Sequence, residues 1–136
     1  MTKEHAERPL IPDLAGSETV LLAEDDELVR DLVSSILHQQ GYKVLVVENG
    51  QKALAAMDSR DGPIDLVLTD MNMPDMDGTQ LFEHISAFHP DARALYMSAD
   101  GSKIIERQDL TESGDNYLQK PFSLRKLAAK VREVLG

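Results

Sequence analysis

Short apolar runs alternate with segments of helical periodicity along most of this chain. Five runs have the length and the continuous apolar character of buried strands, and they cover residues 19–23, 43–47, 64–69, 94–97 and 117–119. After each run, apolar residues recur every three or four positions. This spacing predicts helices over 27–40, from Asn49 through Met57, through 81–85 up to Pro90, over 101–108 and over 124–135.

Capping residues stand at the boundaries of three of these helices. Asp26, Asn49 and Ser123 each precede a helical segment, where their side chains can accept a hydrogen bond from a backbone N–H of the first turn. Gly41 follows the first helix, and glycine commonly ends a helix at that position. The helix over 101–108 is the weakest prediction, because Ile104 and Ile105 are its only large apolar residues.

The order of elements is a strand followed by a helix, repeated five times. Strands that are apolar throughout, with helices between them, imply a parallel sheet that is covered on both faces. We therefore predict one α/β domain over residues 19–136. Residues 1–18 are polar, contain two prolines and a glycine, and have no sustained periodicity, so we interpret them as a linker or a disordered tail.

The charge of the chain narrows the choice of partners. Its 136 residues carry 14 basic and 24 acidic side chains, a net charge of −10, which argues against direct binding to nucleic acid or to an anionic membrane surface. Cysteine is absent, which fits a cytoplasmic location. No apolar stretch approaches the roughly 18 residues of a membrane-spanning helix, and residues 1–18 lack the apolar core of a signal peptide.

Polar side chains that suit one kind of chemistry follow four of the predicted strands. They are acids after the first and third strands, a hydroxyl after the fourth and an ammonium after the fifth, namely Glu24, Asp25, Asp26, Asp70, Ser98 and Lys120. In open α/β sheets, ligands bind beyond the carboxyl ends of the strands. Carboxylates, a hydroxyl and an ammonium at that edge suit a hard divalent cation and a phosphoryl group.

Asp70 is the most informative of these residues. Taken alone, it fits the role of an N-cap or turn residue equally well, since aspartate is common in both. If the first and third strands are neighbours, however, Asp70 joins an acidic cluster in which like charges repel and raise one another's pKa. A bound Mg²⁺ relieves that repulsion. We expect Glu24 and Asp25 to bind it, because Asp26 is assigned as the helix cap.

Four segments resemble, in order and in spacing, the motifs of two-component response-regulator receiver domains. They read VLLAEDD at 20–26, LTDMNMPDMDG at 68–78, YMSA at 96–99 and LQKPF at 118–122. The resemblance covers about residues 18–136, and the four motifs together are highly specific. It implies a flavodoxin-like fold, with helices on both sides of a five-stranded parallel sheet in the order 2-1-3-4-5.

The resemblance also implies roles for individual residues. Asp70 is the expected phosphoacceptor, and Lys120 is expected to contact the phosphoryl group. Mg²⁺ is the expected cofactor, bound by the carboxylates of Glu24, Asp25 and Asp70 and by the backbone carbonyl of Asn72.

Two further residues occupy the positions of the family's switch. Ser98 stands where the family has a serine or threonine, and Tyr117 stands at the position of the switch aromatic. We expect these two side chains to move together on phosphorylation. The resemblance, and the need to turn Lys120 back over the site, predict a cis peptide bond between Lys120 and Pro121.

The expected partners follow from the same resemblance. A histidine kinase or a histidine phosphotransfer protein is the expected phosphoryl donor, residues 101–135 are the expected output surface, and a monomer is the expected oligomeric state. Residues 18–22 and 118–123 are most similar to receivers at the C-terminal end of hybrid sensor histidine kinases, but a stand-alone receiver fits equally well. Two departures from the commonest pattern are Glu24, where aspartate is usual, and the charged segment 100–115.

Two other functions compete with a phosphoryl-accepting switch. A hydrolase of the haloacid-dehalogenase type would carry a general-acid aspartate two residues after its nucleophile, but Asn72 stands there. Steady turnover of a small phosphate ester would revive that hypothesis. A binding module that has lost phosphorylation would usually lack an acid or the lysine, whereas the full set is present here. Failure of a phosphodonor to label Asp70 would favour such a module.

Overall fold

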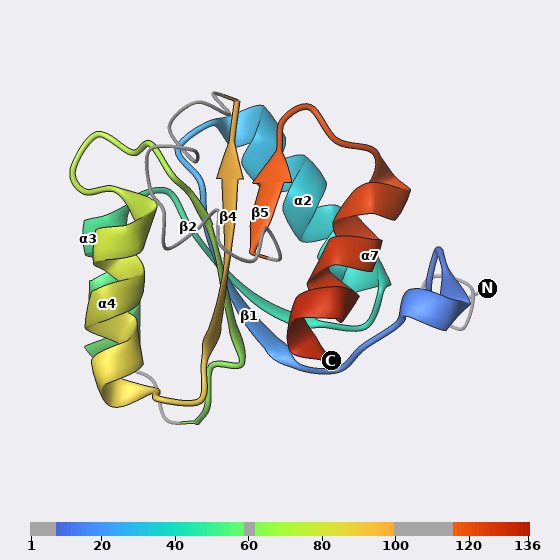
Figure 1. Cartoon of the computed structure of the whole chain (residues 1–136), viewed down its shortest axis with the longest axis horizontal. Coiled ribbons are helices and arrows are strands. Elements are labelled where there is room, and N and C mark those ends of the chain that lie inside the picture. The colour runs from blue at the N-terminus through green and yellow to red at the C-terminus, as the bar shows by residue number, and fades with distance from the viewer. Residues whose placement is uncertain (1–7, 59–61, 100–115) are drawn as a thin grey trace.

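A five-stranded parallel sheet forms the middle layer of the molecule (Figure 1). The computed structural model describes residues 8–58, 62–99 and 116–136. The strands lie in the order β2-β1-β3-β4-β5, which confirms the flavodoxin-like order. They are β1 (Thr19–Ala23), β2 (Lys43–Val47), β3 (Leu66–Asp70), β4 (Arg93–Ser98) and β5 (Tyr117–Gln119).

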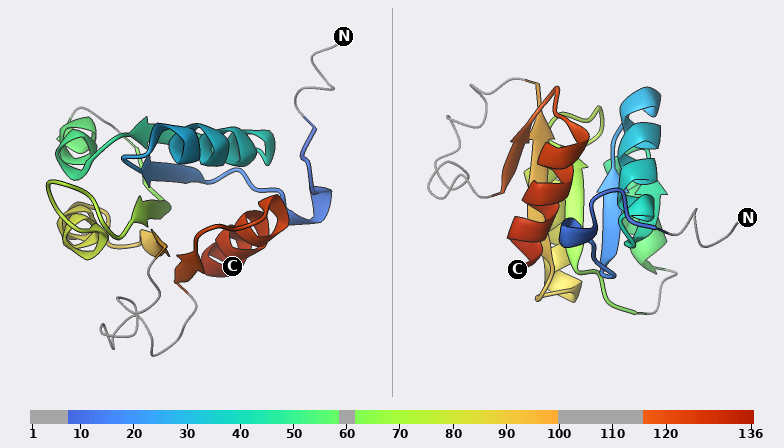
Figure 2. Two further views of the ribbon diagram at one scale, coloured as in Figure 1. Left: turned by 90° about the horizontal axis from the view of Figure 1, so that it is seen from above. Right: turned by 90° about the vertical axis from the view of Figure 1, so that its right-hand side faces the viewer.

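Helices cover both faces of this sheet (Figure 2). Helices α2 (Glu27–Gln39) and α7 (Leu124–Leu135) pack on one face, and α3 (Gly50–Asp58) and α4 (Gly78–Phe88) pack on the other. The helix expected over 101–108 falls within 100–115, which lies outside the described residues. None of the helices in the described part of the chain is long and apolar enough to cross a membrane.

The inner strands β1, β3 and β4 are mainly apolar because both of their faces are buried, whereas the edge strands β2 and β5 are partly exposed. In β1, Val20 and Leu22 join the core under α2 and α7, whereas Leu21 and Ala23 join the core under α3 and α4. All four side chains are fully shielded from solvent. Alternate residues of a strand point to opposite faces, so a strand buried on both sides needs no polar position.

The predicted helix caps are confirmed. The Asp26 carboxylate accepts hydrogen bonds from the N–H groups of Leu28 and Val29, at 2.9 and 3.2 Å. The Asn49 side chain accepts from Lys52 N–H at 2.8 Å, and the Ser123 hydroxyl accepts from Lys126 N–H at 3.0 Å. Gly41 follows α2 with a left-handed φ of 106°, so a glycine is favoured there.

The third strand begins two residues later than its apolar run predicts. Pairing with β1 starts at Leu66, opposite Val20. Asp65 lies just before it, and its carboxylate accepts a hydrogen bond from Thr19 N–H at 2.9 Å. Ile64 is buried as a core residue but stands outside the strand.

Residues 11–18 lie against the ends of α2 and α7. The buried Gln40 side chain holds the backbone of Ile11 twice, accepting from its N–H at 2.8 Å and donating to its carbonyl at 2.9 Å. From α7, the Arg132 guanidinium donates to the carbonyl of Ala15 at 3.2 Å and forms an ion pair with Glu18. A short helix, η1 (Pro12–Leu14), lies between these anchors and contacts α7.

The ion pair between Glu18 and Arg132 ties the start of the first strand to the last helix. The hydrogen bond from Arg132 lowers the pKa of Glu18 from 4.5 to about 2. Because this pKa is lower in the folded state than in the unfolded chain, the carboxylate stabilises the fold fully above pH 4.5. That contribution is lost as the pH falls from 4.5 toward 2.

We expect Glu18→Gln to lower the free energy of unfolding at pH 7 by about 1 kcal/mol, the upper end for a partly exposed ion pair. Urea denaturation of both proteins from pH 7 to pH 3 should show the difference shrinking below pH 4.5. Glu48→Gln, which removes an exposed pair with Lys52, is the control and should cost less. A difference that stays constant down to pH 3 would show that the ion pair is not the cause.

Candidate functional site

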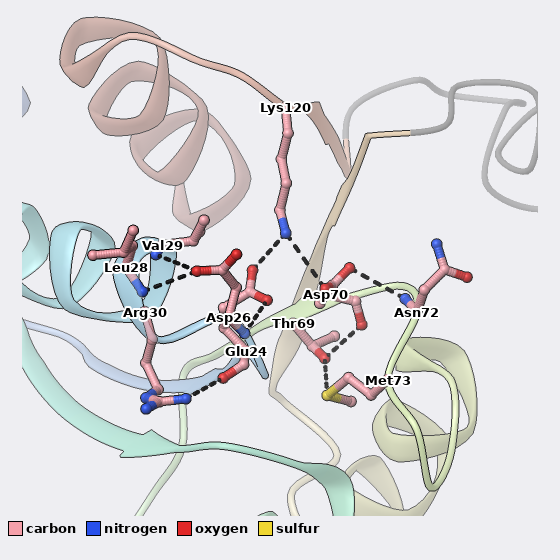
Figure 3. Close-up of polar contacts among 10 residues, drawn as sticks. All are labelled: Glu24, Asp26, Leu28, Val29, Arg30, Thr69, Asp70, Asn72, Met73 and Lys120. Atoms are coloured by element: carbon pink, nitrogen blue, oxygen red, sulfur yellow. Dashed lines mark hydrogen bonds and ion pairs between the residues drawn. The ribbon is translucent and has the colours of Figure 1, made fainter.

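Three carboxylates meet at the carboxyl edge of the sheet. Strands β1 and β3 are neighbours, with Ala23 paired to Thr69, so the residues that follow them lie side by side. One oxygen each from Glu24, Asp25 and Asp70 lies within 4.8 Å of the others. Figure 3 shows Glu24 and Asp70 with the Lys120 side chain directed between them.

Glu24 is the most deeply buried member of this group, with no exposed surface. Burial raises its pKa from 4.5 to about 7, against the opposing hydrogen bond from Lys120. Its carboxylate accepts from Lys120 Nζ at 2.6 Å and from Asp26 N–H at 3.1 Å. Burial disfavours the ionised form of this carboxyl group, and a nearby positive charge stabilises that form.

Lys120 supplies part of that positive charge. Its Nζ lies 2.6 Å from Glu24 Oε1 and 3.4 Å from Asp70 Oδ2. Burial alone would lower the pKa of the Lys120 ammonium, but the two carboxylates, Glu24 foremost, more than offset this and raise it. The Lys120 N–H donates to the Ser98 carbonyl at 2.9 Å, and the Lys120–Pro121 bond is cis, as predicted.

Asp70 is the last residue of β3 and is 7% exposed, so its carboxylate reaches the surface only at the site. One oxygen faces Lys120, and the other accepts from Asn72 N–H at 3.2 Å. Behind it, the buried Thr69 hydroxyl donates to the Asp70 carbonyl at 3.0 Å. Gly78 also packs against this carbonyl. A Cβ at position 78 would stand 2.8 Å from the Asp70 carbonyl oxygen, so a larger residue would clash there.

The two expected switch residues lie on the neighbouring strands β4 and β5. Ser98 is fully buried at the end of β4, and its backbone is bonded to that of Lys120. Tyr117 begins β5, paired with Tyr96, and its ring packs against the small cluster that contains Met71. Their roles as switch residues stay a prediction.

Some residues that shape the site were not predicted from the sequence. Arg30, on α2, donates a hydrogen bond to the Glu24 carbonyl at 2.9 Å and so fixes the loop that bears the acidic pair, Glu24 and Asp25 (Figure 3). Thr69 holds the backbone of Asp70 in the same way. The only sequence feature that pointed to Arg30 was its position one helical turn after the cap Asp26. Thr69 is a polar residue at the end of an apolar run, which was itself a usable signal.

The donor set fits Mg²⁺. Hard carboxylate oxygens and few protein ligands are what this ion takes in proteins, with water or phosphate oxygens completing its octahedron. Glu24, Asp25 and Asp70 supply such oxygens within one ion's reach. Asp26 is committed to capping α2, which agrees with its assignment as a cap rather than a ligand.

Comparison with known proteins identifies the family. The model of the response regulator receiver domain matches residues 20–132. The chain is 37% identical over 123 residues to the sensor kinase CckA of Brucella abortus, covering 90% of this chain and 13% of that protein. It is 34% identical over 116 residues to the transcriptional regulatory protein TrcR of Mycobacterium tuberculosis, covering 85% of this chain and 44% of that protein.

Solved structures agree with this assignment. The chemotaxis response regulator CheY4 of Vibrio cholerae superposes with a TM-score of 0.76 at 26% identity, covering 88% of this chain and 100% of that one. The receiver domain of the hybrid histidine kinase CckA gives 0.70 at 29% identity, covering 87% and 99%. The chain belongs to the response regulator receiver domain family of two-component signalling. It spans less than half the length of the two curated relatives named above.

We expect Lys120→Met to raise the pKa of Glu24 above its value of about 7, because the hydrogen bond that opposes burial is lost. The titration of the Glu24 side-chain carboxyl, followed by ¹³C NMR in metal-free buffer, measures this directly. Lys126→Met removes an exposed lysine from α7 and should leave the midpoint unchanged. A midpoint that falls in the Lys120 variant would mean that the ammonium does not hold the Glu24 carboxylate.

Proposed function

We propose that this chain is a phosphoryl-accepting switch of a two-component phosphorelay, and that Asp70 is its phosphoacceptor. The observation that carries this proposal is the position of Asp70. It lies at the carboxyl edge of the sheet, within ligand distance of Glu24 and Asp25, with the Lys120 ammonium 3.4 Å from its carboxylate. A nucleophile, a cation site and a fixed ammonium are the parts that phosphoryl transfer needs.

The reaction that we propose is transfer from a phosphohistidine. An oxygen of the Asp70 carboxylate forms a bond to phosphorus as the N–P bond of the donor breaks, and the imidazole nitrogen keeps the electron pair and takes up a proton. Glu24, Asp25, Asp70 and the carbonyl of Asn72 would hold Mg²⁺, which neutralises charge on the phosphoryl oxygens. Lys120 contributes a second positive charge at the same place, and Ser98 donates a hydrogen bond to the acyl phosphate.

The chain is not proposed to be a turnover enzyme, because its own side chain is the substrate. The acyl phosphate is lost slowly to water in a reaction that the domain itself assists. Asn72 stands where a general acid would have to act, and its amide cannot supply a proton. Rapid turnover therefore has no catalyst in this site, which suits a signal that must persist long enough to be read.

The proposed donor is a histidine kinase or a histidine phosphotransfer protein, in the cytoplasm, and α2 offers it an apolar surface. Leu28 and Leu32 on this helix are 80% and 57% exposed. Beside them lies a groove of about 320 Å³ whose walls include Lys120 and Phe122. Lys120 lines this groove and also contacts Asp70, so a donor whose histidine reaches Asp70 approaches beside the groove.

The proposed output surface is the face formed by residues 101–135. Its described part consists of β5 and α7, and residues 100–115 lie outside the described residues. Tyr117 and Lys120 connect this face to the site, because both lie on or beside β5. The chain is proposed to act as a monomer.

We expect Asp70 to be the only residue that accepts a phosphoryl group. Incubation with acetyl phosphate and Mg²⁺ should add one phosphate to the intact mass of the wild-type chain, and Asp70→Asn should abolish the gain. A phosphate that persists in the variant would contradict the assignment.

A matched pair of variants controls for the metal in that experiment. Asp25→Ala should remove most of the Mg²⁺-dependent labelling, since it deletes a proposed ligand. Asp26→Ala should retain it, because Asp26 is the cap of α2. Equal losses in the two variants would show that the acidic pair is misassigned.

We expect phosphorylation to shift Ser98 and Tyr117 together. The acyl phosphate draws the Ser98 hydroxyl toward itself, which frees space for the Tyr117 ring to turn inward. Amide shifts measured with and without beryllofluoride, a mimic of the phosphoryl group, should concentrate between residues 98 and 126. Shifts concentrated on α2 instead would contradict the switch and would favour a partner that reads the state of the domain from that helix.

A further inference from the structure

The loop that follows Asp70 is hydrogen-bonded to the amino end of α3, a helix that carries none of the proposed site residues. Asp75 lies five residues after Asp70, and its carboxylate accepts hydrogen bonds from the first two N–H groups of α3. These are the N–H of Gly50 at 3.3 Å and that of Gln51 at 2.8 Å. A carboxylate at this position also faces the positive end of the helix dipole. The cap of α3 is therefore shared between its own chain segment and the loop after β3.

Side chains on either side of Asp75 seat the same loop. Met76 lies directly against Gly50, where an added Cβ would stand 2.4 Å from Met76 Cγ. Met73 is 9% exposed and packs into the core under α3 and α4. The Thr69 hydroxyl lies 4.0 Å from the Met73 sulfur. The packed methionines set how deep the loop lies, and Asp75 sets its position along the end of α3.

Asn72 lies inside this fastened loop. It stands one residue before Met73 and three before Asp75, and its N–H donates to the Asp70 carboxylate at 3.2 Å. Its backbone carbonyl has no side-chain freedom, so its position is fixed by the path of the loop alone. Together with the hydrogen bond from Asn72 to Asp70, the contacts of residues 73–76 therefore set where the Asn72 carbonyl lies relative to the carboxylates of Glu24, Asp25 and Asp70.

We propose that Asp75 is a positioning residue of the metal site, which sets the Asn72 carbonyl by fastening the loop to the amino end of α3. The inference rests on the proposed function, because it presupposes that the site binds Mg²⁺. The competing explanation is that Asp75 only stabilises α3. The chain supplies the control that separates the two, since Asn49 caps the same helix through Lys52 N–H but belongs to no part of the loop.

The experiment follows the ¹³C signal of the Asn72 carbonyl by NMR while Mg²⁺ is titrated into the isotope-labelled full chain. We expect Asp75→Ala to raise the Mg²⁺ concentration at half-saturation by roughly tenfold, the low end for loss of an outer-shell partner of a metal ligand. Asp75→Asn keeps one acceptor oxygen and should fall between wild type and Asp75→Ala. Asn49→Ala should leave the half-saturation concentration as in the wild type, although it removes a cap of the same helix.

Each outcome of the titration decides the question. An unchanged half-saturation point in Asp75→Ala, or an equal change in Asn49→Ala, overturns the positioning role while the proposed function stands. Absence of Mg²⁺ binding in the wild-type chain overturns both. Urea denaturation of the variants shows that each is folded, and the intermediate Asp75→Asn provides the test if the alanine variant is not.

Discussion

Mutual repulsion among the carboxylates at one edge of the sheet is the constraint on which the rest of the structure depends. Glu24, Asp25 and Asp70 present oxygens within 4.8 Å of one another, and Glu24 is fully buried. Such an arrangement is unfavourable unless positive charge is close, because burial and like charges both penalise ionisation. Lys120 supplies a fixed charge, and the donor set suits a divalent cation. Binding of a cation, or neutralisation of one carboxylate, would therefore relieve the repulsion within this group.

The parallel sheet holds these charges together within a stable fold. Order β2-β1-β3-β4-β5 brings the ends of β1 and β3 together and leaves the ends of β4 and β5 beside them. Strands β1 and β3 are buried along their whole length between two layers of helices. Asp70 ends β3, and hydrogen bonds from Arg30 and Asn72 attach the adjoining loops to the scaffold. The unfavourable charges thus lie at one edge of a sheet whose central strands are fully buried.

Sequence patterns were sufficient for the strands, the helix caps and the residues at the strand ends. Each of these depends on local signals, such as continuous apolar runs or a capping side chain before a helix. Contacts between distant segments outside the site were not predicted, because no local pattern encodes them. Gln40 with Ile11, and Asp75 with the amino end of α3, are of this kind. The start of β3 was also misplaced, since Ile64 is buried without pairing to β1. The roles of Ser98 and Tyr117 concern motion, which a single conformation does not display.

The anchoring of residues 11–18 has a consequence for access. Gln40 and Arg132 hold this segment at the amino ends of the strands, and β1 then runs the full depth of the sheet before Glu24. Residues 11–18 and the acidic edge therefore lie at opposite ends of the sheet. As a result, residues 11–18 do not cover the Asp70 carboxylate, which lies at the other end of the sheet. Contacts at residues 11–18 and contacts at the acidic edge involve opposite ends of the sheet, so a change at one end leaves the contacts of the other in place.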